Sequence, residues 1–123
     1  MACLLVERFS IVTTLSVSVP VLAENLARSG MAIRCARVRA SEVPVLDLEI
    51  PGSDARARIT DEMSRALAED DIGAIVLGCA GMADLAGELS RQFQIPVIDG
   101  VAAAVSLAEA LLGSMPLKAP GAC

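Results

Sequence analysis

Short, almost wholly apolar segments rich in β-branched residues recur along this chain, and they constrain its fold more than any other feature. The clearest are residues 9–12 and 74–77, and residues 96–98 form a third. Continuous apolar runs of this length are typical of strands in a parallel sheet that is covered on both faces. Residues 32–38 carry arginines on both sides of the pleat, so we expect this strand at a sheet edge.

Helical patterns separate these strands, because apolar residues recur there at spacings of three and four. The expected helices run from Pro20 to Ser29, from Asp54 through Leu67, from Met82 to Phe93, and from Gly100 to Leu112. The alternation of strand and helix predicts an α/β fold, a doubly wound parallel sheet of four strands. The last helix is nearly apolar all round, so we expect either the sheet or another chain to cover it on more than one side.

The whole chain, residues 1–123, is expected to form a single α/β domain. Residues 39–52 are its one long connection and could cover a neighbouring element, and residues 115–123 are expected to form a flexible tail. A cluster of three arginines is followed by three acidic residues that balance its charge, and we expect this cluster at a solvated sheet edge. The arginines are Arg34, Arg37 and Arg39, and the acidic residues are Glu42, Asp47 and Glu49.

Composition excludes several classes of function. The chain has no histidine, tryptophan or tyrosine, which excludes Ser-His-Asp and Cys-His catalysis and histidine metal sites. A formal charge of −5 and an aromatic content of 2% argue against nucleic-acid binding. The longest uncharged segment, residues 9–23, contains Thr, Ser and Pro and is too short to span a membrane.

Four cysteines, Cys3, Cys35, Cys79 and Cys123, lie too far apart for any common metal-binding spacing. We therefore expect no metal site and free thiols rather than a disulfide framework. The N-terminal residues lack the basic segment of a secretory signal, so a cytoplasmic location is expected.

The strongest candidate site is the turn Gly78-Cys79-Ala80-Gly81-Met82, which joins a predicted strand to a predicted helix. Ligands of open α/β sheets bind beyond the carboxyl ends of the strands. The glycines let backbone N–H groups converge on a ligand, and a helix N-terminus favours the thiolate form of a cysteine placed there. Cys79 could equally be a small buried apolar residue.

The strand that ends at residue 12 is followed by Thr13, Thr14 and Ser16, whose hydroxyls would face the same crevice. Ordinary turn chemistry explains these residues equally well. Asp99 ends the fourth strand at the same edge, and it is more simply the N-cap of the last helix than a catalytic acid.

Residues 74–83 together with residues 95–104 closely resemble the second half of hydantoin and allantoin racemases, which belong to the aspartate/glutamate racemase superfamily. Residues 8–14, with Val19-Pro20-Val21-Leu22, are similar to the segment that opens the second lobe in that family. The resemblance covers residues 7–113 and implies that the chain is one lobe of a two-lobed racemase fold.

The resemblance implies a racemase of hydantoins, allantoin or related amino-acid derivatives that needs no cofactor. In that family two cysteines, one from each lobe, face the α-carbon of the substrate from opposite sides. Cys79 matches the cysteine of the second lobe. The resemblance further implies that the substrate is bound by Thr13, Thr14, Gly78, Ala80, Gly81 and Met82.

The family's first lobe, with its own cysteine, has no counterpart in this sequence. Cys3 precedes the first strand rather than following one, so it cannot replace that cysteine. We expect either a homo-oligomer or a separate first lobe to complete the site. A non-catalytic remnant or small-carboxylate binding lobe stays open, as does related chemistry such as maleate isomerisation or malonate decarboxylation, although Ala80-Gly81-Met82 favours the hydantoin branch.

Overall fold

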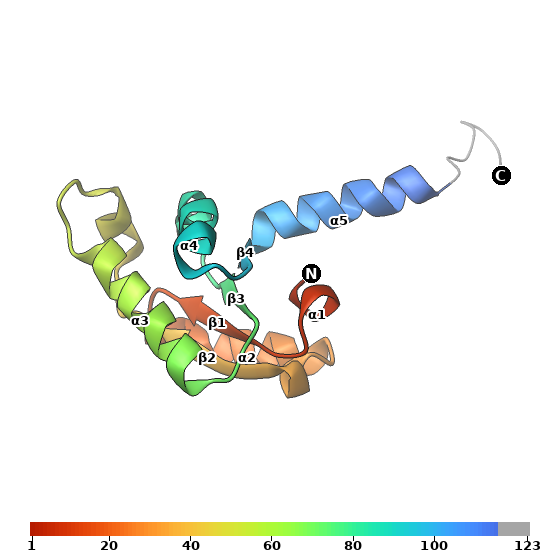
Figure 1. The fold of residues 1–123 in the computed structure, drawn as a ribbon, viewed down its shortest axis with the longest axis horizontal. Coiled ribbons are helices and arrows are strands. Elements are labelled where there is room, and N and C mark those ends of the chain that lie inside the picture. The colour runs from red at the N-terminus through yellow and green to blue at the C-terminus, as the bar shows by residue number, and fades with distance from the viewer. Residues whose placement is uncertain (116–123) are drawn as a thin grey trace.

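The computed structural model describes residues 1–115, and a sheet of four strands forms its centre (Figure 1). The strands are β1 (Phe9–Thr13), β2 (Cys35–Ala40), β3 (Ala74–Leu77) and β4 (Val97–Asp99). They are all parallel and lie in the order β2-β1-β3-β4. The predicted doubly wound sheet, with β2 at an edge, is therefore confirmed. The predicted flexible tail, residues 115–123, lies outside the described residues except for Met115.

Helices cover both faces of this sheet: α1 (Ala2–Leu5) and α2 (Val19–Arg28) lie on one face, and α3 (Ala55–Glu69) and α4 (Ala86–Phe93) on the other. A fifth helix, α5 (Gly100–Ser114), follows β4. Alternate residues of a strand point to opposite faces. Ile75 and Leu77 thus pack with α3 and α4, whereas Ala74 and Val76 pack in a second core with α1 and α2. This two-faced burial explains why the strand sequences are apolar without alternation.

Two segments differ locally from the structure that the sequence predicts. Residues Ala32–Arg34 form a 3₁₀ turn, so β2 begins only at Cys35 and extends to Ala40. A second 3₁₀ turn, η4 (Ala80–Leu85), replaces the first part of the predicted third helix, and α4 begins at Ala86. In a 3₁₀ turn, residues three apart share one side, which lets Met82 and Leu85 both pack against the core beneath.

The sheet covers little of the last helix, so of the two expected covers only another chain stays a prediction. Figure 1 shows α5 extending away from the sheet and from the other helices. Within α5 only Ala103 and Leu107 are half-buried, and every other residue is exposed. The Asp99 carboxylate accepts hydrogen bonds from the N–H groups of Val101 and Ala102, at 3.2 and 3.0 Å. The predicted N-cap is thereby confirmed, and it fixes where the helix begins.

The expected solvated arginine edge is wrong for Arg39, whose side chain is only 4% exposed. Its guanidinium donates two hydrogen bonds of 2.7 Å to Asp70, and others to Glu62 and Glu69. The Ser10 hydroxyl also donates to Asp70, at 2.7 Å. Acidic side chains of α3 and the residue after it are thus the partners of Arg39, not the acidic residues of the following loop.

The other two arginines of that set differ from Arg39. The Arg34 side chain donates to the main-chain carbonyls of Val6 and Glu7, while Arg37 lies exposed beside Glu69 at 3.5 Å. Hydrogen bonds from Arg39 hold the pKa of the Asp70 carboxyl, and that of Glu69, below their ordinary values. The network ties the edge strand β2 to α3 and to the chain that enters β3.

Asp70→Asn should lower the free energy of unfolding by about 3 kcal/mol, because it leaves a buried guanidinium without its bidentate partner. Urea denaturation followed by circular dichroism measures this loss. The pKa of Asp70 is depressed in the folded state, so its contribution is present above about pH 4 and is lost as the pH falls further. The difference between variant and wild type should therefore shrink in acid.

Asp71→Asn is the matched control. Asp71 is the next residue, its side chain is fully exposed, and its nearest basic group, on Arg8, is 4.0 Å away. Exposed pairs of this kind contribute about 0–1 kcal/mol. Equal losses from the two substitutions would contradict the assigned role of Asp70.

Candidate functional site

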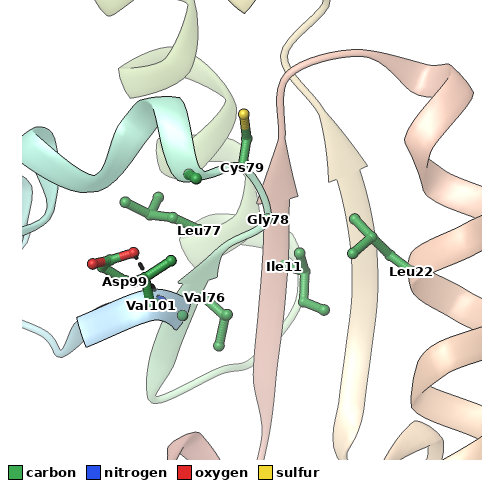
Figure 2. A pocket seen from close by; sticks show the side chains of 10 residues that line it. Ile11, Leu22, Val76, Leu77, Gly78, Cys79, Asp99 and Val101 are labelled. Atoms are coloured by element: carbon green, nitrogen blue, oxygen red, sulfur yellow. Dashed lines mark hydrogen bonds between the residues drawn. The ribbon is translucent and has the colours of Figure 1, made fainter. Parts of the chain in front are cut away.

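The strand order reverses between β1 and β3, because β1 continues to β2 on one side and β3 to β4 on the other. A cavity of about 250 Å³ opens near the carboxyl ends of β3 and β4 (Figure 2). It is lined by Ile11, Leu22, Val76, Leu77, Gly78, Cys79, Ala80, Asp99, Gly100 and Val101. A switch point of this kind is where open α/β sheets bind their ligands.

Gly78 fixes the turn that carries the thiol. Its N–H donates to the Val12 carbonyl of β1 at 2.8 Å, so the turn begins directly from the sheet. A Cβ at this position would lie 2.9 Å from the Ile11 Cγ2 and 3.0 Å from the Thr13 Cβ. Gly78 therefore leaves room for the side chains of Ile11 and Thr13, which any larger residue would displace.

Cys79 stands at the end of this turn, half-buried, with its side chain beyond the end of β3 (Figure 2). In the described part of the chain the N–H groups of Cys79, Ala80 and Gly81 have no hydrogen-bond acceptor, whereas the Met82 N–H closes the turn onto the Cys79 carbonyl. The α-helical N-terminus expected here lies farther on, at Ala86. Beside the thiol the turn therefore presents free N–H groups rather than the dipole of a long helix.

Thr13 and Thr14 lie at the carboxyl end of β1, but both are buried and neither lines the cavity. The carbonyl of Thr13 accepts from the Ser41 N–H at 2.9 Å, and that of Thr14 from the Val43 N–H at 3.1 Å. Within the described residues the Thr13 hydroxyl has no hydrogen-bond partner. Leaving a buried hydroxyl unpaired costs about 1–3 kcal/mol, so the Thr13 hydroxyl lowers the stability of the fold where it stands.

Gly81 and Met82 follow Cys79 but do not line the cavity. The Met82 side chain is fully buried in the core between the sheet and α3, so only its backbone faces the turn. A Cβ on Gly81 would lie 2.8 Å from the Val45 Cγ1, a residue of the 3₁₀ turn η3 (Val45–Glu49). The long connection does cover a neighbouring element, and that element is the turn carrying the thiol.

Sequence reasoning missed several lining residues. Leu22 reaches the cavity from α2, and Val101 from the first turn of α5. The apolar spacing of Leu22 and Leu26 signals one buried helix face, but not that the first of them borders a cavity. Asp99 lies at this edge as the sequence predicts, although its carboxylate is engaged by the helix N–H groups.

Comparison with known proteins shows the family of the chain. The model of the Asp/Glu/Hydantoin racemase family matches residues 1–108. The chain belongs to this racemase family. A hydantoin racemase of Rhizobium meliloti is 47% identical over 108 residues, 88% of this chain and 45% of that protein. A hydantoin racemase of Pseudomonas sp. (strain NS671) is 40% identical over 113 residues, 91% of this chain and 45% of that protein.

Solved structures of the racemase family show the same fold. The allantoin racemase from Klebsiella pneumoniae superposes with a TM-score of 0.87 at 40% identity, covering 100% of this chain and 55% of that one. The allantoin racemase from Pseudomonas fluorescens gives 0.85 at 37% identity, covering 98% of this chain and 57% of that one. This racemase-family chain therefore spans about half the length of the relatives that it matches.

Two further observations concern the described residues of this racemase-family chain. Among them, no group of three or more acidic or cysteine side chains is placed to hold a metal ion. None of the helices in this part of the chain has both the length and the apolar character needed to cross a membrane.

Gly78→Ala should destabilise the chain by about 1–3 kcal/mol, because a methyl group there must displace the buried side chains of β1. Urea denaturation measures the loss. Gly87→Ala, in α4, is the matched control: its nearest neighbour is an Arg91 guanidinium nitrogen 3.8 Å away, so the added methyl meets no obstacle. It should stabilise the chain by about 0.5–1 kcal/mol. Stabilisation by both substitutions would contradict the close approach at Gly78.

Iodoacetamide should modify Cys79 several-fold faster than Cys35 in the folded protein at neutral pH. Cys79 borders an open cavity beside free N–H groups, whereas burial raises the pKa of the Cys35 thiol and reduces its thiolate fraction. Mass spectrometry of peptides gives both rates. In urea the two rates should converge, and faster labelling of Cys35 in the folded state would count against an accessible thiol at the turn.

Proposed function

We propose that this chain supplies one half of a two-base racemase, with Cys79 as the group that moves the proton. The substrates would be hydantoins, allantoin or related cyclic amino-acid derivatives. The observation that carries this proposal is the thiol of Cys79 placed at an open cavity beside the unpaired N–H groups of Ala80 and Gly81. The names of the relatives, hydantoin racemase and allantoin racemase, supply the substrate class.

The chemistry follows from the acidity of the substrate. The α-proton of a five-membered hydantoin ring is acidified by the adjacent carbonyl. The Cys79 thiolate would take this proton, the C–H electron pair would form the enolate, and the negative charge would develop on the carbonyl oxygen. Backbone N–H donors that need no reorganisation stabilise such a charge. Return of a proton to the opposite face of the α-carbon would complete the inversion, and no cofactor is needed for these steps.

The residues around Cys79 would contribute to substrate binding in different ways. Gly78 and Ala80 line the cavity, and Gly81 adds an N–H donor, so these three would hold the substrate through the backbone. Met82 would contribute by packing beneath the turn, because its side chain is in the core. The Thr13 side chain lies next to Gly78, and Thr14 follows it; because both are buried outside the cavity, they would support substrate binding by holding the end of β1 beneath the turn.

A second proton donor must come from outside the described residues of one copy. Neither Cys3 nor Cys35 lines the cavity that holds Cys79. The second thiol would therefore belong to another lobe or to another copy of this chain. One thiol alone removes and returns a proton on the same face, which exchanges the proton without inverting the carbon.

A second candidate function is binding without catalysis. The observation that favours it is that a single thiol borders a cavity of about 250 Å³ whose other lining residues are mostly apolar. Such a lobe would hold a small anion, a carboxylate or imide oxygen, on the free N–H groups of the turn and would leave its carbon centre unchanged.

Deuterium exchange separates these functions. An enantiomerically pure 5-substituted hydantoin is incubated with the protein in D2O, and NMR follows the α-proton while polarimetry follows inversion. Proton transfer by Cys79 predicts exchange above the uncatalysed background, and inversion is expected only where a second thiol reaches the site. Cys79→Ser should reduce exchange at least a hundredfold, because general base catalysis contributes about 10²–10⁴-fold.

Cys35→Ser is the matched control and should leave the exchange rate unchanged, since Cys35 lies outside the cavity. Ligand binding by calorimetry with exchange at the background rate would favour the binding lobe. Full exchange in Cys79→Ser would overturn the cysteine mechanism.

A further inference from the structure

The thiol of Cys79 lies next to apolar side chains from the long connection that follows β2. The position that a Cβ would take on Gly81 is 2.8 Å from the Val45 Cγ1, 3.6 Å from the Cys79 Sγ and 3.7 Å from the Leu48 Cδ1. The thiol and two apolar side chains of η3 thus surround one small space beside the turn. None of these three atoms is a nitrogen or an oxygen, so the thiol has an apolar neighbourhood on this side.

The main chain of the connection holds η3 in place. Before η3, Val43 is fully buried, and its N–H donates to the Thr14 carbonyl at the end of β1, at 3.1 Å. Within η3, the Asp47 carbonyl accepts from the Ser53 hydroxyl at 2.6 Å. Val45 itself is 40% exposed. It is therefore a positioned side chain that still presents apolar surface beside the thiol.

The cavity and η3 lie on different sides of the thiol. The cavity is lined from β1, α2, β3, β4 and the start of α5, and neither Val45 nor Leu48 lines it. η3 contacts the turn through Gly81 instead. The α-carbon of a cyclic substrate carries the ring and one substituent, which leave this carbon in different directions. With the α-carbon at the Cys79 Sγ and the ring in the cavity, the substituent points to η3.

We infer that Val45 is a specificity-determining residue, and that it makes this chain prefer hydantoins with an alkyl substituent to allantoin. The inference rests on the proposed function and names the substrate class of the same site. Allantoin is a hydantoin whose substituent is a ureido group, with N–H donors and a carbonyl acceptor. An isobutyl group has the same number of heavy atoms and the same branching, but none of them is polar. The two substituents therefore differ in polarity and not in shape.

The surroundings of Val45 favour the alkyl group. Val45 and Leu48 would cover an isobutyl group, whereas a ureido group in the same place would lose its hydrogen bonds to water without gaining others. The unpaired N–H groups of Ala80 and Gly81 do not compensate, because the proposed mechanism assigns them to the ring carbonyl, where the enolate charge develops.

The test compares the binding of 5-isobutylhydantoin and allantoin to the full chain by calorimetry. Binding is measured because it does not require the second thiol that inversion needs. The wild type should bind 5-isobutylhydantoin about tenfold more tightly, since small differences in contact with an apolar pocket change affinity by about 10–200-fold. Val45→Thr keeps the shape of the side chain and adds a hydroxyl, so it should reduce this ratio about threefold or more. Because Val45 is partly exposed, the variant should keep the wild-type circular dichroism spectrum.

Val21→Thr is the matched control: it makes the same change at a valine of α2 that is 58% exposed and does not line the cavity. It should keep the wild-type ratio of the two affinities. Equal affinity of the wild type for both compounds, or an unchanged ratio in Val45→Thr, would overturn this inference and leave the proposed function standing. Binding of neither compound at millimolar concentration would overturn the proposed function together with this inference.

Discussion

The close approach of β1 and β3 is the contact on which the candidate site depends. These two strands pair from Phe9–Ala74 to Val12–Leu77, and the Gly78 N–H extends the pairing by one more hydrogen bond to Val12. A residue with a Cβ would displace the Ile11 and Thr13 side chains there. The next residue, Cys79, is consequently released at the edge of the sheet, where the chain turns and its N–H groups lose their strand partners. The position of the thiol thus follows from sheet pairing and from one missing side chain.

Two different forces hold the elements around this pairing. Apolar burial dominates in the middle of the sheet, where Ile59, Met63 and Ile75 are fully excluded from water. At the edge strand β2, the hydrogen bonds of the Arg39 guanidinium hold the strand in place, because its five N–H donors match the carboxylates around it. An edge strand with little apolar surface is thereby attached to α3. The chain gains a defined position for β2, and with it for the loop that covers the thiol turn.

A site of this design is open on one side. The cavity beside Cys79 has walls from β3, β4 and the start of α5, and most described residues of α5 beyond it are exposed. The proposed inversion of a carbon acid needs a proton donor on each face of that carbon and exclusion of water. Both requirements call for a second body at this edge.

The strands, their parallel arrangement and the turn carrying Cys79 are predictable from the sequence, because apolar runs, helical spacing and glycines are local signals. The Asp99 cap is predictable too, since Asp99 acts on its own helix. The partners of Arg39 are known only from the fold, because they are 23 to 31 residues away along the chain. The fold likewise decided that residues 80–85 wind as a 3₁₀ turn and that α5 leaves the sheet. Long-range charge pairing and helix direction depend on which surfaces meet, and no local pattern encodes that.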